Sequence, residues 1–157
     1  MVVTARLAHE PFEPDRELGR FLPSLADAGG VVSFVGIARG QSASGSRVTG
    51  LFLDHHPRLT LRSLEEIANA ALTRFEISDA LVVHRCGALV PGDPIVLAAA
   101  AARHRKPALE AVDYMMDRLK CEAVFWKRED GSATSTWIEP TGDDRIALAR
   151  WSEKCPE

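Results

Sequence analysis

Four consecutive basic or titratable residues stand where an apolar stretch gives way to a helical pattern. Arg103, His104, Arg105 and Lys106 follow an alanine-rich run, and Pro107 opens the expected helix. A helix N-terminus carries unpaired N–H groups and a partial positive charge, so acidic residues normally occupy its first turn. Cations there add to that charge, and the pattern predicts a site for an anion such as a phosphate group. A solvated, charged surface is the alternative interpretation.

Two lysines flank the corner between the end of this helix and the strand that follows it. Lys120 lies at the edge of the apolar stripe of the helix expected over 107–121, and Lys127 shares a strand face with Phe125. If that face is covered, loss of water lowers the pKa of the ammonium group, which can then serve as acid, base or nucleophile. In the alternative interpretation both lysines reach solvent and only their aliphatic stems are covered.

Arg39 ends an apolar strand beside a loop of small residues over 41–46, where a guanidinium group can bind a phosphate through two hydrogen bonds. His55 and His56 are adjacent, and neighbouring residues of a strand point to opposite faces. We therefore expect a capping or surface role for this pair rather than a metal site. His84 alternates with apolar neighbours and is predicted to be a core residue.

The cysteines are scattered. Cys86, Cys121 and Cys155 form no Cys-x-x-Cys pair, and their spacing does not suit a structural zinc site. Three separate cysteines favour reduced thiols and a cytoplasmic protein. Because Cys121 follows Lys120 directly, a persulfide on Cys121 is an alternative source of sulfur chemistry. A structural cysteine is the simpler interpretation.

The elements that must position these residues follow from hydrophobic periodicity. We expect strands at 31–35, 47–55, 81–84, 95–101, 123–128 and 134–139, and helices at 57–75, 107–121 and 143–151. The strand–helix–strand passages predict an α+β fold in two layers, with a small antiparallel sheet added by the last hairpin.

Length and composition exclude several classes of protein. The chain has 157 residues, of which 46% are hydrophobic, so a single folded domain over 1–157 is expected and a disordered chain is not. No apolar run is long enough to cross a membrane and no signal peptide is visible. The net charge of −3 argues against a general nucleic-acid binder. Residues 103–128 nevertheless carry seven basic and four acidic side chains, a local excess of +3.

From about residue 29 to residue 151 the chain resembles the catalytic (large) subunit family of molybdopterin synthase, whereas residues 1–28 lie outside this resemblance. The segments that carry it are 30–39, 53–57, 84–89, 91–93, 103–105, 116–120 and 125–129. The resemblance implies an α/β hammerhead-type fold and a homodimer. Each protomer would bind a small ubiquitin-like sulfur carrier, which gives a heterotetramer.

The resemblance also implies a reaction. The carrier's C-terminal Gly-Gly thiocarboxylate would enter a pocket of this subunit. The substrate would be cyclic pyranopterin monophosphate (precursor Z), and two successive sulfur transfers would create the dithiolene of molybdopterin. No bound metal and no cofactor are expected.

Motif matching then assigns residues. Lys120 and Lys127 occupy the catalytic positions, where they also contact the substrate. The positions at which the family binds the anionic substrate and the carrier tail are Arg39, His104, Arg105 and Arg128. Ile37, Ala38 and Glu129 belong to the same segments.

The chain departs from the family pattern at four places. His56 stands where the family usually has tyrosine, and Arg58 and Leu59 where it often has Gly-Met. Ile37 stands where some relatives have lysine, and Thr141 where members often have arginine. Thr141 therefore implies that one anion contact is missing or replaced. Two other functions remain open at this point: a persulfide sulfurtransferase that uses Cys121, and a non-catalytic module of the same fold that binds a phosphate ligand or a protein.

Overall fold

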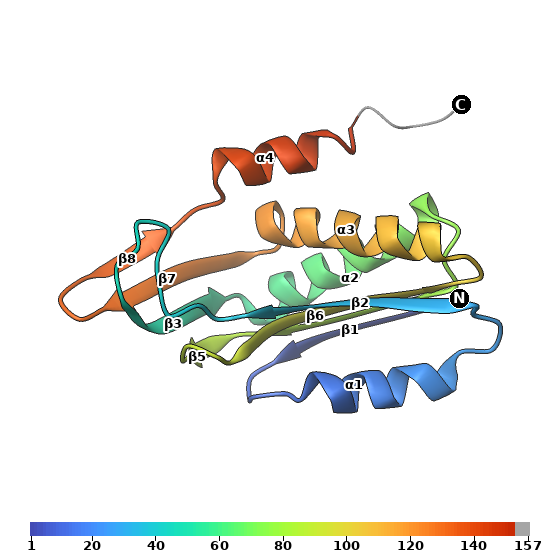
Figure 1. Cartoon of the computed structure of the whole chain (residues 1–157), viewed down its shortest axis with the longest axis horizontal. Coiled ribbons are helices and arrows are strands. Elements are labelled where there is room, and N and C mark those ends of the chain that lie inside the picture. Colours follow the sequence, from blue (N-terminus) through green and yellow to red (C-terminus); the bar gives the residue numbers. More distant parts are fainter. Residues whose placement is uncertain (153–157) are drawn as a thin grey trace.

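The computed structural model describes residues 1–152, which form two four-stranded sheets (Figure 1). In spatial order the first sheet contains β1 (Val2–Ala8), β4 (Asp79–Arg85), β6 (Pro94–Ala102) and β2 (Gly30–Ile37). The second contains β5 (Gly87–Leu89), β3 (Val48–His55), β7 (Phe125–Gly131) and β8 (Ser135–Ile138). Only β1 and β4 pair in parallel among these strands.

Helices cover both faces of the first sheet (Figure 1). α2 (Pro57–Arg74) and α3 (Arg105–Cys121) lie on one face. α1 (Pro14–Phe21), followed by a 3-10 turn at Leu22–Ser24, lies on the other. α4 (Gly142–Ala149) packs on the outer side of α3. None of the helices in residues 1–152 is long and apolar enough to span a membrane.

The alanine-rich strand β6 occupies the middle of the first sheet. Ala98, Ala100 and Ala102 belong to the core cluster under α2 and α3, whereas Ala99 and Ala101 belong to the cluster under α1. All five are fully buried. Alanine is a poor strand former, but its small side chain lets helices approach the sheet closely. This close packing accounts for the alanine-rich strand.

The expected α+β architecture with an added antiparallel sheet is confirmed. Three short elements were not expected: β1, α1 and β5. β1 does alternate, with Val3, Ala5 and Leu7 packed inward, but it is only seven residues long and joins the sheet through a distant parallel partner, β4. Cys155 lies outside the described residues.

Two histidine predictions are confirmed. His56 caps α2, since its Nδ1 accepts a hydrogen bond from the Leu59 N–H at 3.2 Å, and Pro57 begins the helix. His84 is only 4% exposed, and its ring stacks on that of Phe125 with centroids 4.2 Å apart. His84 therefore joins the two sheets from inside the protein.

Candidate active site

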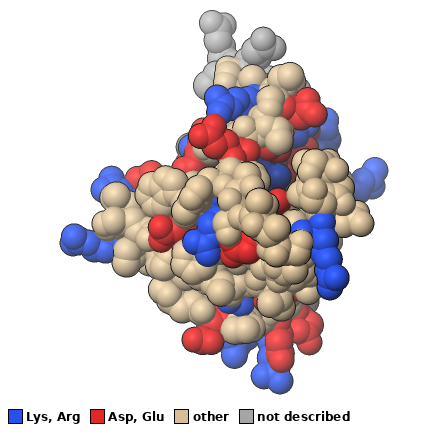
Figure 2. Space-filling model, turned by 90° about the vertical axis from the view of Figure 1, so that its left-hand side faces the viewer, with Lys and Arg blue, Asp and Glu red and all other residues tan. Residues whose placement is uncertain are grey.

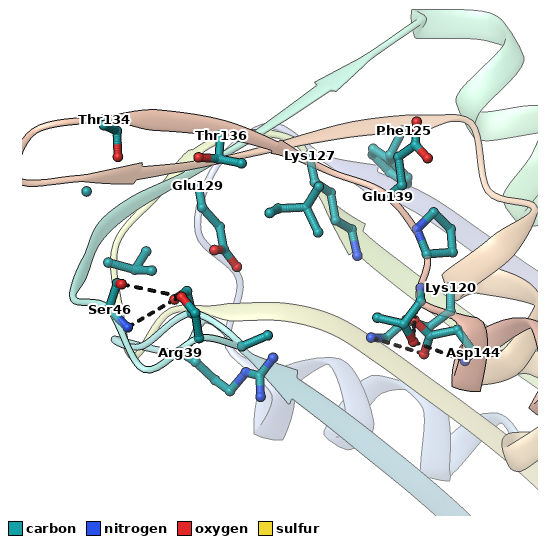
Figure 3. A pocket seen from close by; sticks show the side chains of 18 of the residues that line it. Arg39, Ser46, Lys120, Phe125, Lys127, Glu129, Thr134, Thr136, Glu139 and Asp144 are labelled. Carbon is teal, nitrogen blue, oxygen red and sulfur yellow. Dashed lines mark hydrogen bonds and ion pairs between the residues drawn. The ribbon is translucent and has the colours of Figure 1, made fainter.

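A cavity of about 620 Å³ lies between the last turn of α3, the β7–β8 hairpin, the start of α4 and the loop that follows β2. A second cavity of about 510 Å³ adjoins it on the side of β2. Both are lined by Arg39, Lys120, Lys127 and Glu129. Figure 3 shows Lys127 and Glu129 projecting from β7 into this space, with Lys120 beside Asp144 at its edge. The fold therefore brings together four of the residues that the sequence predicts for the site.

Lys127 is the most enclosed cation of the cavity. Strand alternation places Phe125, Lys127 and Glu129 on the cavity side of β7. Burial lowers the pKa of Lys127, and the charge of Lys120 lowers it further, whereas Asp144 and Glu129 oppose the shift. Desolvation disfavours the ammonium form, so Lys127 gives up its proton more readily than a solvated lysine. Of the two alternatives that the sequence left open, the covered face is thus the one that applies to Lys127.

Lys120 has a different environment. It lies in the last turn of α3, its side chain is 51% exposed, and its Nζ is 3.6 Å from Asp144 Oδ1. Asp144 is itself held in place, because the backbone N–H and the hydroxyl of Thr141 both donate to Oδ2 at 2.8 Å. Burial raises the pKa of Asp144, but the hydrogen bonds from Thr141 and the charge of Lys120 outweigh it and leave the pKa lowered. An ionised Asp144 thus anchors Lys120 at the cavity edge.

The loop after β2 supplies the other wall. Arg39 is exposed to the cavity, and the hydroxyl-bearing residues Ser42, Ser44 and Ser46 line it as well. Ile37 lines the adjoining cavity and is 55% exposed. Guanidinium, ammonium and hydroxyl groups around one space suit a phosphate-bearing ligand.

His84, on β4, also lines the second cavity. Burial lowers its pKa to about 4; the backbone bond to Arg85 opposes this, and the charge of Lys127 adds to it. The imidazole is therefore neutral at physiological pH. Its Nδ1 donates to the Arg85 carbonyl at 2.8 Å, because a carbonyl can only accept. His84 contributes no second positive charge beneath Lys127.

Two predicted site residues lie far from this cavity. His104 and Arg105 are exposed at the N-terminal end of α3, whereas Lys120 lies in its last turn. At ~1.5 Å per residue the helix separates Arg105 from Lys120 by ~22 Å along its axis. A single copy of the chain does not bring His104 and Arg105 to the lysines.

Arg128 and Ala38 are close in sequence to cavity residues but point elsewhere. Arg128 lies on the opposite face of β7 from Lys127, where its Nε donates to Asp130 at 2.8 Å and its guanidinium group lies 5.0 Å from the Phe52 ring centroid. Ala38 is 5% exposed, and its N–H donates to the Asp93 carbonyl at 2.9 Å. Neither lines the cavities, because strand alternation and a backbone turn direct them away.

Sequence reasoning missed Asp144. The signal was present, since Thr141 and Asp144 have the spacing of a capping box at the start of the expected last helix. What the spacing does not reveal is that α4 folds back onto the end of α3. Thr141 therefore acts here by fixing Asp144.

Cys121 also lines the larger cavity. Burial raises the pKa of its thiol, and the charges of Asp144, Asp117 and Glu122 raise it further, with Arg145 opposing. A persulfide carrier needs a thiolate, and these surroundings disfavour one.

Charges of both signs are interspersed over the end of the molecule formed by the second sheet (Figure 2). The cations of the cavity are thus a local arrangement within an overall acidic chain of net charge −3.

Comparison with known proteins assigns this chain to a family. The family model described as MoaE protein matches residues 7–122. The molybdopterin synthase catalytic subunit of Caulobacter vibrioides is 42% identical over 154 residues, which cover 98% of this chain and 99% of that protein. The solved structure of the molybdopterin biosynthesis MoaE protein from Burkholderia ambifaria has a TM-score of 0.82 and 34% identity, with 98% of this chain and 100% of that chain covered.

A more distant structure shares the fold. It is a chain of the complex of subunits 1 and 2 of molybdopterin-converting factor from Helicobacter pylori, with a TM-score of 0.70, 19% identity, and coverage of 88% of this chain and 90% of that chain. The model match and the full-length identity to curated relatives together establish that this chain belongs to the MoaE family, the catalytic subunits of molybdopterin synthase.

Proposed function

We propose that this cytoplasmic chain transfers two sulfurs in succession from the C-terminal thiocarboxylate of a small ubiquitin-like carrier to cyclic pyranopterin monophosphate, with Lys120 and Lys127 as catalytic residues. The observation that carries the proposal is the convergence of two lysines on one cavity: Lys127, which has a lowered pKa, faces the same space as Lys120 and Arg39. Sulfur arrives on the partner, so no cysteine of this chain is needed.

The two lysines have different tasks in this proposal. Lys127, which burial makes less basic, exchanges protons with the substrate as the cyclic phosphate opens and sulfur adds. Lys120, whose Nζ lies 3.6 Å from Asp144 Oδ1, polarises the substrate from the cavity edge. Arg39 binds the phosphate group, and the loop serines donate further hydrogen bonds. No bound metal or cofactor takes part.

The second cavity is the proposed entry for the carrier tail. It is continuous with the larger cavity through the shared lysines, and Ile37 and Phe34 on β2 give it an apolar wall. An extended Gly-Gly terminus has no side chains to accommodate, so it can approach Lys120 and Lys127 closely. The two-subunit complex of the Helicobacter pylori neighbour supports a small partner subunit of this kind.

Reconstitution tests this function. The purified chain is mixed with thiocarboxylated carrier and cyclic pyranopterin monophosphate, and molybdopterin is detected. We expect product with the unaltered chain and its loss with Lys120→Ala. Full product from the Lys120→Ala variant would overturn the catalytic assignment, and absence of product with an authentic partner would overturn the function.

His104 and Arg105 enter the proposal through the expected homodimer. Because they lie at the far end of α3 in their own chain, we propose that each reaches the cavity of the second copy. Mixed dimers of a Lys127→Ala chain and an Arg105→Ala chain test this. If Arg105 acts across the interface, one of the two cavities retains both groups and about half of the activity returns. If Arg105 acts within its own chain, both cavities are damaged and no activity returns.

A further inference from the structure

Three potential metal ligands meet at the junction of the two sheets, away from the catalytic cavity. His9 follows β1, His55 ends β3, and Cys86 links β4 to β5. Their ligand atoms all lie within 4.8 Å of one another. None of the three lines either cavity. The sequence offered no hint of this cluster, because 46 and 31 positions separate its successive members.

The strand pairing holds the backbone of this cluster in place. The Cys86 N–H donates to the Ala8 carbonyl at 3.0 Å, which fixes Cys86 beside His9. β5 pairs with β3 up to Leu53 and Gly87, which brings His55 to the same point. Three segments that are remote in sequence are thus joined by backbone hydrogen bonds before any side chain interacts.

The side-chain distances suit a tetrahedral metal ion. Bond lengths of ~2.0 Å to nitrogen and ~2.3 Å to sulfur place two ligand atoms of a tetrahedral zinc ion ~3.3–3.6 Å apart. Cys86 Sγ and His9 Nδ1 are already 3.3 Å apart. The rings of His9 and His55 meet edge to face with centroids 5.4 Å apart, so a small rotation brings the second imidazole nitrogen into the same sphere.

An S–H···N hydrogen bond accounts for the Cys86–His9 contact alone, but it does not account for His55. The burial of the three ligands is also graded: Cys86 is 1% exposed, His55 is half-buried and His9 is exposed. Such a site is closed on the protein side and open to water on the other. It therefore has room for a fourth, solvent ligand.

We propose that His9, His55 and Cys86 bind one borderline-soft divalent cation of the zinc class, with water as the fourth ligand. Imidazole and thiolate are the ligands that such ions prefer. The incoming ion displaces the Cys86 thiol proton to solvent as the metal–sulfur bond forms. The bound ion would tie the ends of β1 and β3 to the β4–β5 link. This role is independent of sulfur transfer.

The test uses the full chain with Cys121→Ser and Cys155→Ser, which leaves Cys86 as its sole thiol. Titration with Co²⁺ should give a thiolate-to-cobalt charge-transfer band and the visible absorption of a tetrahedral site, saturating at one ion per chain. Equimolar Zn²⁺ should remove both signals. Cys86→Ser should abolish the charge-transfer band, and His9→Ala and His55→Asn should each weaken binding at least ~10-fold.

His56→Asn is the matched control. It replaces the histidine next to His55, and asparagine is itself a good helix cap, so metal affinity should not change. Because Cys86 is buried and its variant can fail to fold, the variant of exposed His9 keeps the test decisive. Zn²⁺ should also raise the Tm of the parent chain and not that of the His9→Ala variant. The proposal is overturned by absence of the charge-transfer band in the parent, or by equal affinity in the parent, His9→Ala and His55→Asn proteins.

Discussion

Two basic regions of this protein contain the same kinds of residue in opposite settings. The start of α3 carries Arg103, His104, Arg105 and Lys106, all exposed. The cavity at the other end of α3 holds Lys120 and Lys127 with Arg39. At the helix start Lys106 Nζ lies 3.9 Å from the Glu110 carboxylate, one turn away. In the cavity Lys127 is desolvated and feels the charges of Lys120, Asp144 and Glu129.

This difference shows that a high local density of charge does not by itself give side chains altered reactivity. The helix start is the denser cluster, yet water surrounds each of its charges and screens them. In the cavity, the hairpin, the loop after β2 and α4 enclose Lys127, so burial and the charges of Lys120, Asp144 and Glu129 shift its pKa. A cation that must exchange protons needs an enclosed setting such as the cavity. A cation that attracts an anion from solution can work at an exposed site such as the start of α3.

The largest expected effect comes from removing the enclosed amine. Lys127→Met keeps the aliphatic stem and removes the proton carrier, so molybdopterin formation should fall ~10²–10⁴-fold, the range for a lost acid–base group. Lys106→Met, the matched change in the exposed region, should leave the rate within about twofold. Steady-state assays of both variants with saturating carrier measure this. Similar losses in the two variants would remove the distinction between the regions.

A change at His84 tests whether burial controls ionisation beneath the cavity. The pKa of His84 is about 4 in the folded chain and 6.5 ordinarily. Its contribution to the free energy of unfolding is therefore fully present above pH 6.5 and is lost as the pH falls through 4. That shift corresponds to about 3 kcal/mol. Denaturant unfolding between pH 7 and pH 4 should therefore show a smaller acid loss for His84→Gln than for the unaltered chain. Exposed His104→Gln should keep the original loss, and an unchanged acid loss in His84→Gln would contradict the assignment.

The ion pair at the cavity edge should have a smaller effect. Asp144→Asn removes the charge that holds Lys120 but leaves an oxygen that can still accept from Thr141, so activity should fall about two- to fivefold. Because Asp144 raises the pKa of Lys127, its neutralisation should also move the pH–rate profile to lower pH. Asp143→Asn, at the exposed neighbouring position, is the control. A fall in rate without a shift of the profile would mean that Asp144 acts only on the helix cap.

The smallest expected effect belongs to Cys121. Its thiol has a raised pKa, and the proposed reaction takes its sulfur from the partner. Cys121→Ser should retain full molybdopterin formation with thiocarboxylated carrier. Loss of activity with an unchanged Tm would instead favour the persulfide mechanism.

The sequence by itself determined the order of the main elements, the buried position of His84, the cap at His56 and the cavity face of Lys127. These features depend on residues close in the chain, where the two-residue strand period and the helix start rules apply. The same strand period also places Arg128 on the other face of β7, although motif matching groups it with Lys127. β5, with three residues, is too short to show such a period. β1 alternates, but it is stabilised by a strand distant in sequence.

Only the tertiary structure decided which charged residues share a space. The turn of α4 onto α3 unites Asp144 with Lys120, the length of α3 separates Arg105 from the cavity, and the meeting of two sheets assembles His9, His55 and Cys86. Desolvation and charge interactions depend on distances of a few ångströms between segments far apart in the chain. Local sequence pattern specifies each segment, but those distances are fixed only when the sheets and helices pack.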